Sequence, residues 1–166
     1  SGNGFFDHML TLFARHGRLG LILDCRGDMA VDFHHSCEDI GITLGRALRR
    51  ALGEARGVNR YGWIILPMDE ALVLASVDIS GRGLLNFQVA VPMARVGDFE
   101  SELVKEFWLA FSREAGLTLH LQLLFGDNSH HIIEAVFKAA GRVIAMAAAV
   151  DPAGAGEIPS TKGVLL

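Results

Sequence analysis

The sequence HHSCE at residues 34–38 recurs ninety-six positions later as HHIIE at residues 130–134. Each copy opens a stretch with helical apolar spacing, so its first histidine and its glutamate lie on the same face, one turn apart. Neighbouring side chains on a helix point about 100° apart, so the two histidines of one copy can serve different ions. Two copies of this spacing therefore predict a site for two metal ions.

The ligand types limit which metal ions are expected but do not identify a single one. Imidazole nitrogen and carboxylate oxygen together suit Mn²⁺, Fe²⁺ or Zn²⁺, and a six-coordinate site rich in carboxylate and water favours Mn²⁺. The competing interpretation is that both helices merely begin with polar histidines. A single copy would leave the two interpretations equal, and the repetition favours the metal site.

The repeat extends beyond the histidines. Gly20-Leu21 corresponds to Gly116-Leu117, and Gly45-Arg46 corresponds to Gly141-Arg142. We therefore predict an α/β fold, an α+β two-layer sandwich, made by internal duplication of a unit that contains a sheet and two helices. The predicted parts are a first unit at 1–57, a second unit at 58–152 and an extended arm at 153–166, together forming one compact domain.

Apolar periodicity gives the expected elements of each unit. It predicts helices at residues 5–16, 34–55, 100–115 and 130–150. It predicts strands at 19–25, 29–33, 62–66, 70–80, 84–91 and 116–125. Strands precede the helix at 100–115 but not the helix at 5–16. If the units are equivalent, a leading segment of about 30–40 residues is expected, and the first unit is incomplete at its N-terminus.

Composition excludes several classes of protein. The chain has 166 residues with 51% hydrophobic and 20% charged side chains, and its formal net charge is -4. This charge gives no basic footprint for nucleic acid, and no apolar run reaches the roughly 18 residues of a membrane span. Two cysteines without CxxC spacing favour a reducing compartment. We expect a cytoplasmic protein without nucleic-acid or membrane partners.

Three further histidines have competing interpretations. His8 opens the first helix, where it either completes a metal site or caps the helix. His120 lies between leucines in a strand, which favours a half-buried structural histidine. His16 precedes Gly17 and is typical of a histidine stabilised by the C-terminal end of a helix dipole.

Four side chains are candidates for binding a phosphate group. Arginine offers forked donors to phosphate oxygens, and a serine with a lysine in a glycine-bounded arm can close over them. The candidates are Arg60, Arg82, Ser160 and Lys162. The PSTKG sequence at 159–163 lacks the upstream glycine of a P-loop, which disfavours nucleotide binding. The PMDEA sequence at 67–71 is interpreted as a turn rather than a catalytic segment.

Taken in order, the motifs of this chain closely resemble the imidazoleglycerol-phosphate dehydratase family of histidine biosynthesis. The motifs are GFFDHML (4–10), DFHHSCEDIGITLGRAL (32–48), GVNRYG (57–62), PMDEAL (67–72), DISGRG (78–83), TLHL (118–121), HHIIEAVFKA (130–139) and IPSTKG (158–163). The resemblance implies a lyase that removes water from D-erythro-imidazole glycerol phosphate to give imidazole acetol phosphate. It also implies two Mn²⁺ per active site, a duplicated α/β fold, and trimers that assemble into a 24-subunit shell with active sites shared between subunits.

The same resemblance implies two sets of metal ligands. The first ion would take His8, His35, Glu38 and His131. The second ion would take His34, His130, Glu134 and Glu106. Several family members have histidine, in an EHFF-like motif, where this chain has the Glu106 of KEFW, and His120 is the competing ligand.

The resemblance further implies which residues act on the substrate. Glu134 and Lys138 match catalytic positions of the family. The main acid/base glutamate of the family is expected on a strand of the leading segment. The substrate and its phosphate group would contact His16, Arg60, Arg82, Lys138, Ser160 and Lys162.

The chemistry of such a site is coherent. Two metal ions that hold the imidazole ring as an imidazolate would let its electrons help expel the hydroxyl group, while a general base removes the proton. Two alternatives remain: a metal-driven assembly with impaired catalysis, and a di-metal hydrolase that the ligand cluster alone would allow.

Overall fold

The computed structural model describes residues 1–28, 30–154 and 156–165. Four helices form in these ranges: α1 (Gly4–Gly17), α2 (His34–Leu52), α3 (Leu103–Ala115) and α4 (Ser129–Ala148). One sheet has the order β1-β2-β6-β3, formed by β1 (Tyr61–Met68), β2 (Ala71–Asp78), β6 (Thr118–Phe125) and β3 (Leu84–Gln88). A short ribbon pairs β4 (Arg95–Val96) with β5 (Phe99–Glu100). The sheet is mixed, because β3 runs parallel to β6 whereas its other pairs are antiparallel.

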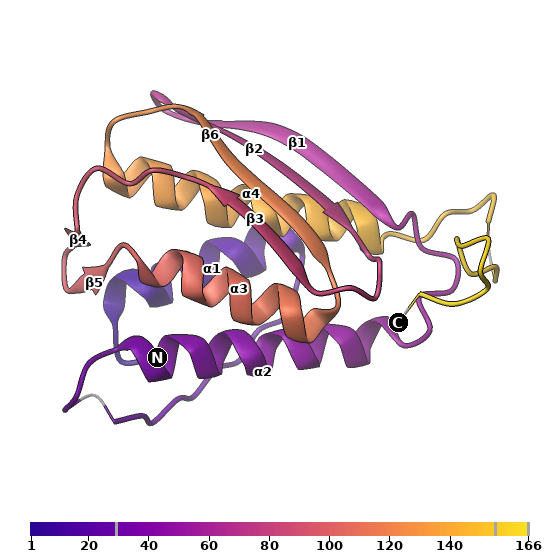
Figure 1. Cartoon of the computed structure of the whole chain (residues 1–166), viewed down its shortest axis with the longest axis horizontal. Helices are drawn as coiled ribbons and strands as arrows, with labels where there is room; N and C mark the ends of the chain where they lie inside the picture. Colours follow the sequence, from indigo (N-terminus) through magenta and orange to yellow (C-terminus); the bar gives the residue numbers. More distant parts are fainter. Residues whose placement is uncertain (29, 155, 166) are drawn as a thin grey trace.

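The helices lie on one side of the sheet in two tiers. Helix α4 packs against β1 and β2, and α3 packs against β3. Helix α1 packs against α4, and α2 packs against α3, so α1 and α2 form a second tier that packs mainly on other helices (Figure 1). This arrangement brings the N-terminal part of the chain beside the second histidine motif.

Local sequence explains where the helices begin and end. The Asn3 side chain accepts a hydrogen bond from the Phe6 amide at the start of α1, and Arg18 ends this helix in the left-handed conformation at φ 53°. Between these caps, the buried residues Phe6, Met9 and Phe13 recur at helical spacing and form one apolar face.

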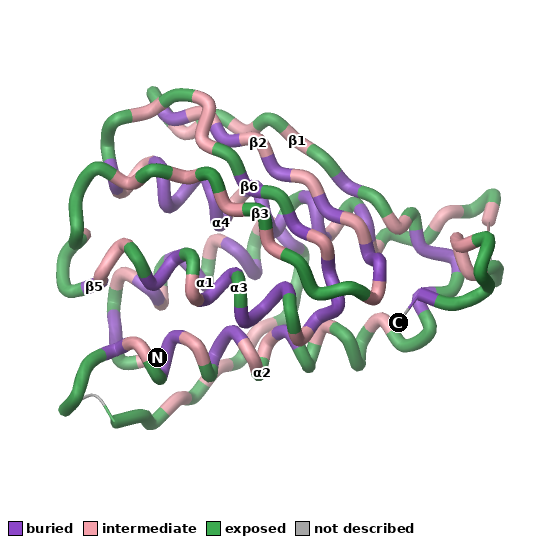
Figure 2. Tube along the Cα trace, in the orientation of Figure 1, coloured by how far each residue is buried: buried purple, intermediate pink, exposed green. Residues whose placement is uncertain are grey.

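The core is strongly aromatic. Phe6 stacks on Phe99 with ring centroids 5.4 Å apart, and Phe107, Trp108 and Phe137 continue the cluster between the helices. Complete burial of a side chain of this size contributes about 1.5–3 kcal/mol. Burial alternates along β2, so one face of the sheet contacts the helices (Figure 2). The other face includes Trp63 of β1, whose exposure is 70% against 0% for Trp108.

The structure confirms the mixed α/β fold class, the four helices and the strands of the second half, with changes at their ends. The internal duplication stays a prediction. Helix α2 ends at Leu52, with Gly53 as its cap, and does not continue towards Gly57. Strand β1 continues through Pro67, and the turn falls at Asp69 and Glu70. Proline is tolerated there because β1 is an edge strand, where no neighbour needs its missing N–H group.

The two strands predicted in the first half are wrong. Residues 19–25 have no regular secondary structure, and residues 30–33 form a turn and bend; Met29 lies outside the described residues. Leu21 and Leu23 do pack towards the core while Ile22 is fully exposed, as alternation predicts. A strand also needs a hydrogen-bonded neighbour, and no described strand pairs with this segment. In the described chain the sheets come from residues 61–125.

The C-terminal arm is also not extended. Its described residues pass through successive turns, with hydrogen bonds from the Glu157 amide to the Gly154 carbonyl and from the Gly163 amide to the Ser160 carbonyl. None of the helices in the described ranges combines the length and apolar content needed to cross a membrane.

Candidate metal centre and phosphate site

The N-terminus of α4 presents both histidines of the second motif in its first turn. The Asn128 side chain accepts hydrogen bonds from the His130 amide at 2.9 Å and from the His131 amide at 3.3 Å. This cap satisfies amides that an open helix end leaves unpaired, and it fixes where α4 begins. The histidines therefore stand at a defined position relative to α1.

His8 of α1 joins His130 and Glu134 of α4 in a potential metal cluster. One ligand atom from each residue lies within 4.8 Å of the others. The Nε2 atoms of His130 and His8 lie 3.2 Å and 3.9 Å from the same carboxylate oxygen, Oε2 of Glu134. Two imidazole nitrogens and one carboxylate oxygen around a common point form a donor set that fits a divalent first-row metal ion.

Lys138 holds the other oxygen of this carboxylate. It lies one turn beyond Glu134 on α4, and its Nζ contacts Oε1 of Glu134. Burial opposes ionisation of Glu134, but the hydrogen bond from Lys138 and the charges of Lys138, His130 and His8 outweigh it, so the pKa of Glu134 is lowered. Glu134 therefore remains an anion although it is only 7% exposed.

His131 contacts a different carboxylate. Its Nδ1 lies 2.7 Å from Oε2 of Glu70, in the turn between β1 and β2. The other oxygen of Glu70 accepts a hydrogen bond from the Asn128 amide at 3.0 Å. The hydrogen bond with Glu70 raises the pKa of His131, and the same contact lowers the pKa of Glu70.

The first motif shows the same contact. Nδ1 of His35 lies 2.8 Å from Oδ2 of Asp28, and this hydrogen bond raises the pKa of His35. The carboxylate of Asp32 accepts a hydrogen bond from the His34 amide at 2.8 Å. Within the described ranges of one chain, this motif does not complete a cluster of three metal ligands.

Glu106 and Glu38 approach the same part of the first motif. Burial, followed by the negative charges of Glu106 and Glu38, raises the pKa of Cys37 to about 12. Cys37 lies on α2, and α3 with Glu106 packs against this helix. Glu106 therefore accompanies the first motif, as His8 accompanies the second.

Within one chain, the packing of the helices brings together only part of the expected ligand sets. His8 was predicted to join His35, Glu38 and His131, whereas within one chain it lies with His130 and Glu134. The reason is that α1 packs against α4 and α3 packs against α2. The sets implied by the family resemblance combine residues of several copies, so they stay a prediction.

His120 lies on β6, on the sheet face opposite the helices that carry the other predicted metal ligands. Strand alternation buries Leu119 and Leu121 on the helix side and leaves His120 exposed on the opposite face of β6. The expectation of a half-buried histidine is therefore wrong. Two residues that sequence analysis did not select, Asp28 and Glu70, do contact the motif histidines.

The structure gathers the predicted phosphate-binding arginines around Asp78. Nε of Arg60 donates to Oδ1 of Asp78 at 2.8 Å, and a terminal nitrogen of Arg82 lies 3.9 Å from the other oxygen. Arg60 also donates to the Pro159 carbonyl at 2.7 Å, which places it next to Ser160. Lys162 is exposed in the same arm. These groups form a cationic cluster at the end of β2.

His16 borders a separate groove between α1, α4 and the start of β1. The groove has a volume of about 560 Å³ and also contains Arg18, Tyr61 and Arg142. Burial, followed by the positive charges of Lys138 and Arg142, lowers the pKa of His16. The groove therefore joins a neutral histidine to two arginines, a combination suited to an anionic or polar ligand.

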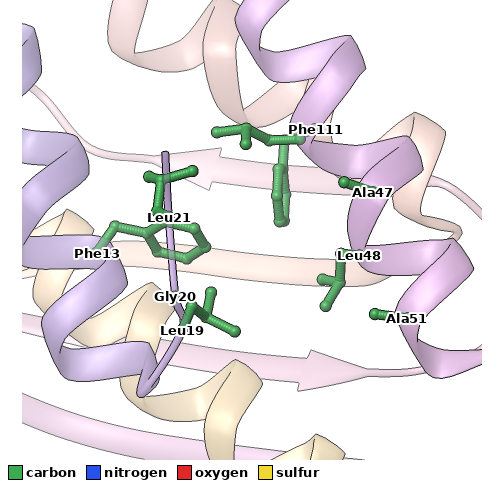
Figure 3. A pocket seen from close by; sticks show the side chains of 9 residues that line it. Phe13, Leu19, Gly20, Leu21, Ala47, Leu48, Ala51 and Phe111 are labelled. Carbon is green, nitrogen blue, oxygen red and sulfur yellow. The ribbon is translucent and has the colours of Figure 1, made fainter. Parts of the chain in front are cut away.

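An apolar cavity of about 170 Å³ lies between α1, α2 and residues 19–21 (Figure 3). Its lining consists of Phe13, Leu19, Gly20, Leu21, Leu44, Ala47, Leu48, Ala51 and Phe111. None of these side chains is charged or hydrogen-bonding, so this cavity is not a candidate for the metal or the phosphate.

The metal cluster and the cationic cluster lie at opposite ends of α4, the helix that runs along the sheet in Figure 1. His130 is in the first turn of α4, whereas the Arg60 amide donates to the Ala147 carbonyl at its end. The rise of an α-helix separates these positions by roughly 25 Å. One small ligand therefore cannot contact both clusters of the same chain.

Comparisons with known proteins agree on one family. The family described as Imidazoleglycerol-phosphate dehydratase matches residues 1–144. The chain is 54% identical over 165 residues to the imidazoleglycerol-phosphate dehydratase of Azorhizobium caulinodans, covering 99% of this chain and 84% of that protein. It is 56% identical to the one from Pelobacter propionicus, with coverage of 99% and 84%.

Solved structures support the same relationship. The dehydratase from Staphylococcus aureus superposes with a TM-score of 0.85 at 44% identity, covering 90% of this chain and 84% of that chain. The structure of the IGPD from Pyrococcus furiosus in complex with (S)-C348 gives a TM-score of 0.80 at 41% identity, covering 97% and 86%. Family match, sequence identity and shared fold together show that this chain belongs to the imidazoleglycerol-phosphate dehydratase family.

Proposed function

We propose that this chain removes water from imidazole glycerol phosphate at a two-metal site assembled from several copies of the chain. Membership of the family makes the chain an enzyme, a hydro-lyase of histidine biosynthesis. The observation that carries the detailed proposal is the cluster of His8, His130 and Glu134, which presents three ligand atoms within 4.8 Å.

We infer that the cofactor is Mn²⁺, with two ions per active site. The cluster supplies mixed nitrogen and oxygen donors, and a six-coordinate ion would keep positions for the substrate and for a histidine from another copy. When bound, such ions would draw electron density from the imidazole ring of the substrate and favour its imidazolate form. Lys138 supports this role, because it keeps the buried carboxylate ionised from the side away from the histidines.

The remaining ligands would form the second half of the site. We assign His34, His35, Glu38, Glu106 and His131 to it. The α2 motif and Glu106 belong to one helix pair, while His131 belongs to the other. Shared sites follow if the α2 end of one copy meets the α4 end of another, which agrees with trimers that assemble into a 24-subunit shell.

The distance along α4 supports the same conclusion. Arg60, Arg82, Ser160 and Lys162 would bind the phosphate, yet they lie roughly 25 Å from the metal cluster of their own chain. A substrate with a ring at one end of a three-carbon chain and phosphate at the other is much shorter. Its phosphate group would therefore be held by a neighbouring copy, where arginine donors not used by Asp78 remain available.

Within the site, proton transfer falls to residues with defined neighbours. Dehydration removes one proton from carbon and one hydroxyl group. Lys138 has an ammonium proton for the departing hydroxyl, which then leaves as water, and the ionised Glu134 beside it would accept the proton from carbon. His16 would contact the substrate from the groove that it borders with Arg18 and Arg142.

We also propose that the chain contains two equivalent units, at 1–57 and 58–152, followed by the arm at 153–166. Gly45 of α2 closely approaches the Phe111 carbonyl of α3, and Gly141 of α4 closely approaches the Phe13 carbonyl of α1. Both glycines are ninety-six positions apart, as the two motifs are. This spacing supports two equivalent units, although the carbonyls that the glycines approach, those of Phe13 and Phe111, are ninety-eight positions apart. A cytoplasmic location is supported by the free thiols of Cys25 and Cys37.

The test uses protein purified without chelator. Metal analysis should give about two Mn²⁺ per chain, native mass should show a large assembly, and turnover should release the acetol phosphate. The substitution His130→Ala should abolish metal binding, assembly and turnover, whereas His120→Ala on the outer sheet face should leave them unchanged. An active multimer with His130→Ala would refute the shared site. Metal-bound assembly without turnover would instead support the catalytically impaired alternative.

A further inference from the structure

Both histidine motifs hold the second histidine in the same way. Nδ1 of His131 is 2.7 Å from a carboxylate oxygen of Glu70, and Nδ1 of His35 is 2.8 Å from a carboxylate oxygen of Asp28. The two carboxylates come from unrelated places in the chain: Glu70 from the turn after β1, and Asp28 from the segment before α2. The same contact is thus built twice from different surroundings.

The contact determines which ring nitrogen is free. An ionised carboxylate only accepts hydrogen bonds, so Nδ1 of each histidine must carry the proton. A neutral imidazole then has its lone pair on Nε2, which is the atom left for a metal ion. At His131 a carboxylate oxygen of Asp69 also lies 3.6 Å from this Nε2. The bond also fixes rotation of the ring, which would otherwise vary for the exposed side chain of His35.

We propose that Glu70 and Asp28 are positioning residues that fix the proton and the orientation of His131 and His35, so that each Nε2 faces a metal ion. This inference rests on the proposed two-metal site. Carboxylates in this position raise the basicity of a ligating histidine and strengthen metal binding by roughly 10–100-fold.

The first histidine of the second motif is held differently, which makes the contact specific. The His130 ring lies edge-on to Phe5, with ring centroids 5.2 Å apart, and its Nε2 points to Glu134. Glu70 also ties the turn between β1 and β2 to the start of α4 through the Asn128 amide. The same carboxylate therefore sets both the position of the helix end and the ring of His131.

The test compares Mn²⁺ binding by variants of the full chain, with free Mn²⁺ measured by electron paramagnetic resonance. Glu70→Ala should weaken one class of sites by about 10–100-fold. Asp28→Ala should weaken binding to a similar extent, which tests the same device at the other motif. The matched control is Asp127→Ala, which removes an equal charge beside α4. Among the described residues, the Asp127 carboxylate has no hydrogen bond or ion pair.

A conservative variant separates orientation from charge. The side-chain carbonyl of glutamine can still accept a hydrogen bond from the Nδ1–H group of His131. Glu70→Gln should therefore bind Mn²⁺ more tightly than Glu70→Ala. Equal losses for Glu70→Gln and Glu70→Ala would overturn the orientation role. A Mn²⁺-binding curve for Glu70→Ala that matches the curve for Asp127→Ala would also overturn the orientation role. A crystal structure of metal-free Glu70→Ala should also show the His131 ring rotated, and an unchanged ring would count against the proposal.

The same experiment distinguishes two kinds of failure. If the unsubstituted protein binds no Mn²⁺, the proposed two-metal function is wrong. If the unsubstituted protein binds Mn²⁺ and Glu70→Ala binds it equally well, only the positioning role of Glu70 is wrong. Thermal unfolding of each metal-free variant, compared at one protein concentration, reports whether the variant is folded.

Discussion

Gly141 sits where α4 crosses α1 with almost no space between the backbones. A Cβ atom at this position would lie 2.6 Å from the Phe13 carbonyl oxygen and 2.9 Å from the Gly17 amide nitrogen. Both neighbours are backbone atoms, so neither can move aside by a change of rotamer. The substitution Gly141→Ala must therefore push the two helices apart.

The size of the effect follows from the geometry. Relaxed contacts between heavy atoms are about 3.5 Å, so the helices must separate by roughly 0.5–1 Å, and nearby side chains lose part of their dispersion contacts. Overpacking of this kind costs about 1–3 kcal/mol, while replacing glycine by alanine inside a helix returns about 1 kcal/mol. We expect a net loss of up to about 2 kcal/mol, or a fall in Tm of about 4–8 °C.

Moving α1 away from α4 should also affect the metal cluster. His8 is on α1, whereas His130 and Glu134 are on α4, so the separation of these helices enlarges the ligand cluster. Gly141→Ala should therefore weaken Mn²⁺ binding as well as stability. The equivalent substitution Gly45→Ala, whose Cβ would lie 2.6 Å from the Phe111 carbonyl, should destabilise the chain to a similar extent.

The assay is urea or thermal unfolding of the metal-free protein at one concentration, with Mn²⁺ titration alongside. Gly4→Ala is the control, because Gly4 lies in α1 and a Cβ there meets nothing within 4 Å. The control should be neutral or slightly stabilised. If Gly141→Ala is as stable as Gly4→Ala, the helices separate without cost and the reasoning is refuted.

Three further predictions concern individual side chains. Lys138→Met leaves the Glu134 carboxylate buried without its partner, so stability at pH 7 should fall by about 3 kcal/mol. Because folding lowers the pKa of Glu134, its ionised form stabilises the native chain above the unfolded-state pKa of about 4.3, and this stabilisation is lost as the pH falls through the lower folded-state pKa. The variant should instead gain stability on acidification, as measured by urea unfolding at several pH values. Cys37, with a pKa of about 12, should not react with a thiol reagent at pH 8 in the native protein, whereas the partly exposed Cys25 should; two rapidly reacting thiols would contradict this. Lys162→Ala should raise the KM for substrate about tenfold, as expected for a lost charge-assisted hydrogen bond, without changing Mn²⁺ content, and an unchanged KM would remove Lys162 from the phosphate site.

The helices were predictable because their signals are local. The apolar positions Phe6, Met9 and Phe13, with polar residues at each end, specify α1 within one turn at either terminus. The second half also contained its strands in recognisable form, because each strand finds its neighbour within residues 61–125. Periodicity and pairing agree there.

Residues 19–25 show where such reasoning fails. Their alternation is real, with Leu21 and Leu23 facing the core and Ile22 exposed. Alternation specifies which side chains face inward, but a strand also requires backbone partners, and those depend on distant segments. The same pattern can therefore belong to an extended segment without a hydrogen-bonded neighbour.

The residues of the candidate site could be proposed from the sequence, but which of them lie together within one chain could not. The repeated motif identified His130 and Glu134, while the pairing of α1 with α4 brought His8 to them. Glu70 was interpreted as part of a turn because its partner, His131, lies 61 positions away in the sequence. Contacts of this kind arise from tertiary packing, which no local spacing specifies.

The two tryptophans give the protein two independent optical reporters. Trp63 projects from the outer face of the edge strand β1 with 70% exposure, whereas Trp108 is enclosed by Phe107, Phe111 and Phe137. Acrylamide should quench Trp63 in the isolated chain and spare Trp108 until the core opens. Emission from Trp63 therefore senses whatever covers the sheet, and emission from Trp108 senses unfolding. A single fluorescence titration with Mn²⁺ can thus separate the association of copies, reported by Trp63, from a change in the core of each copy, reported by Trp108.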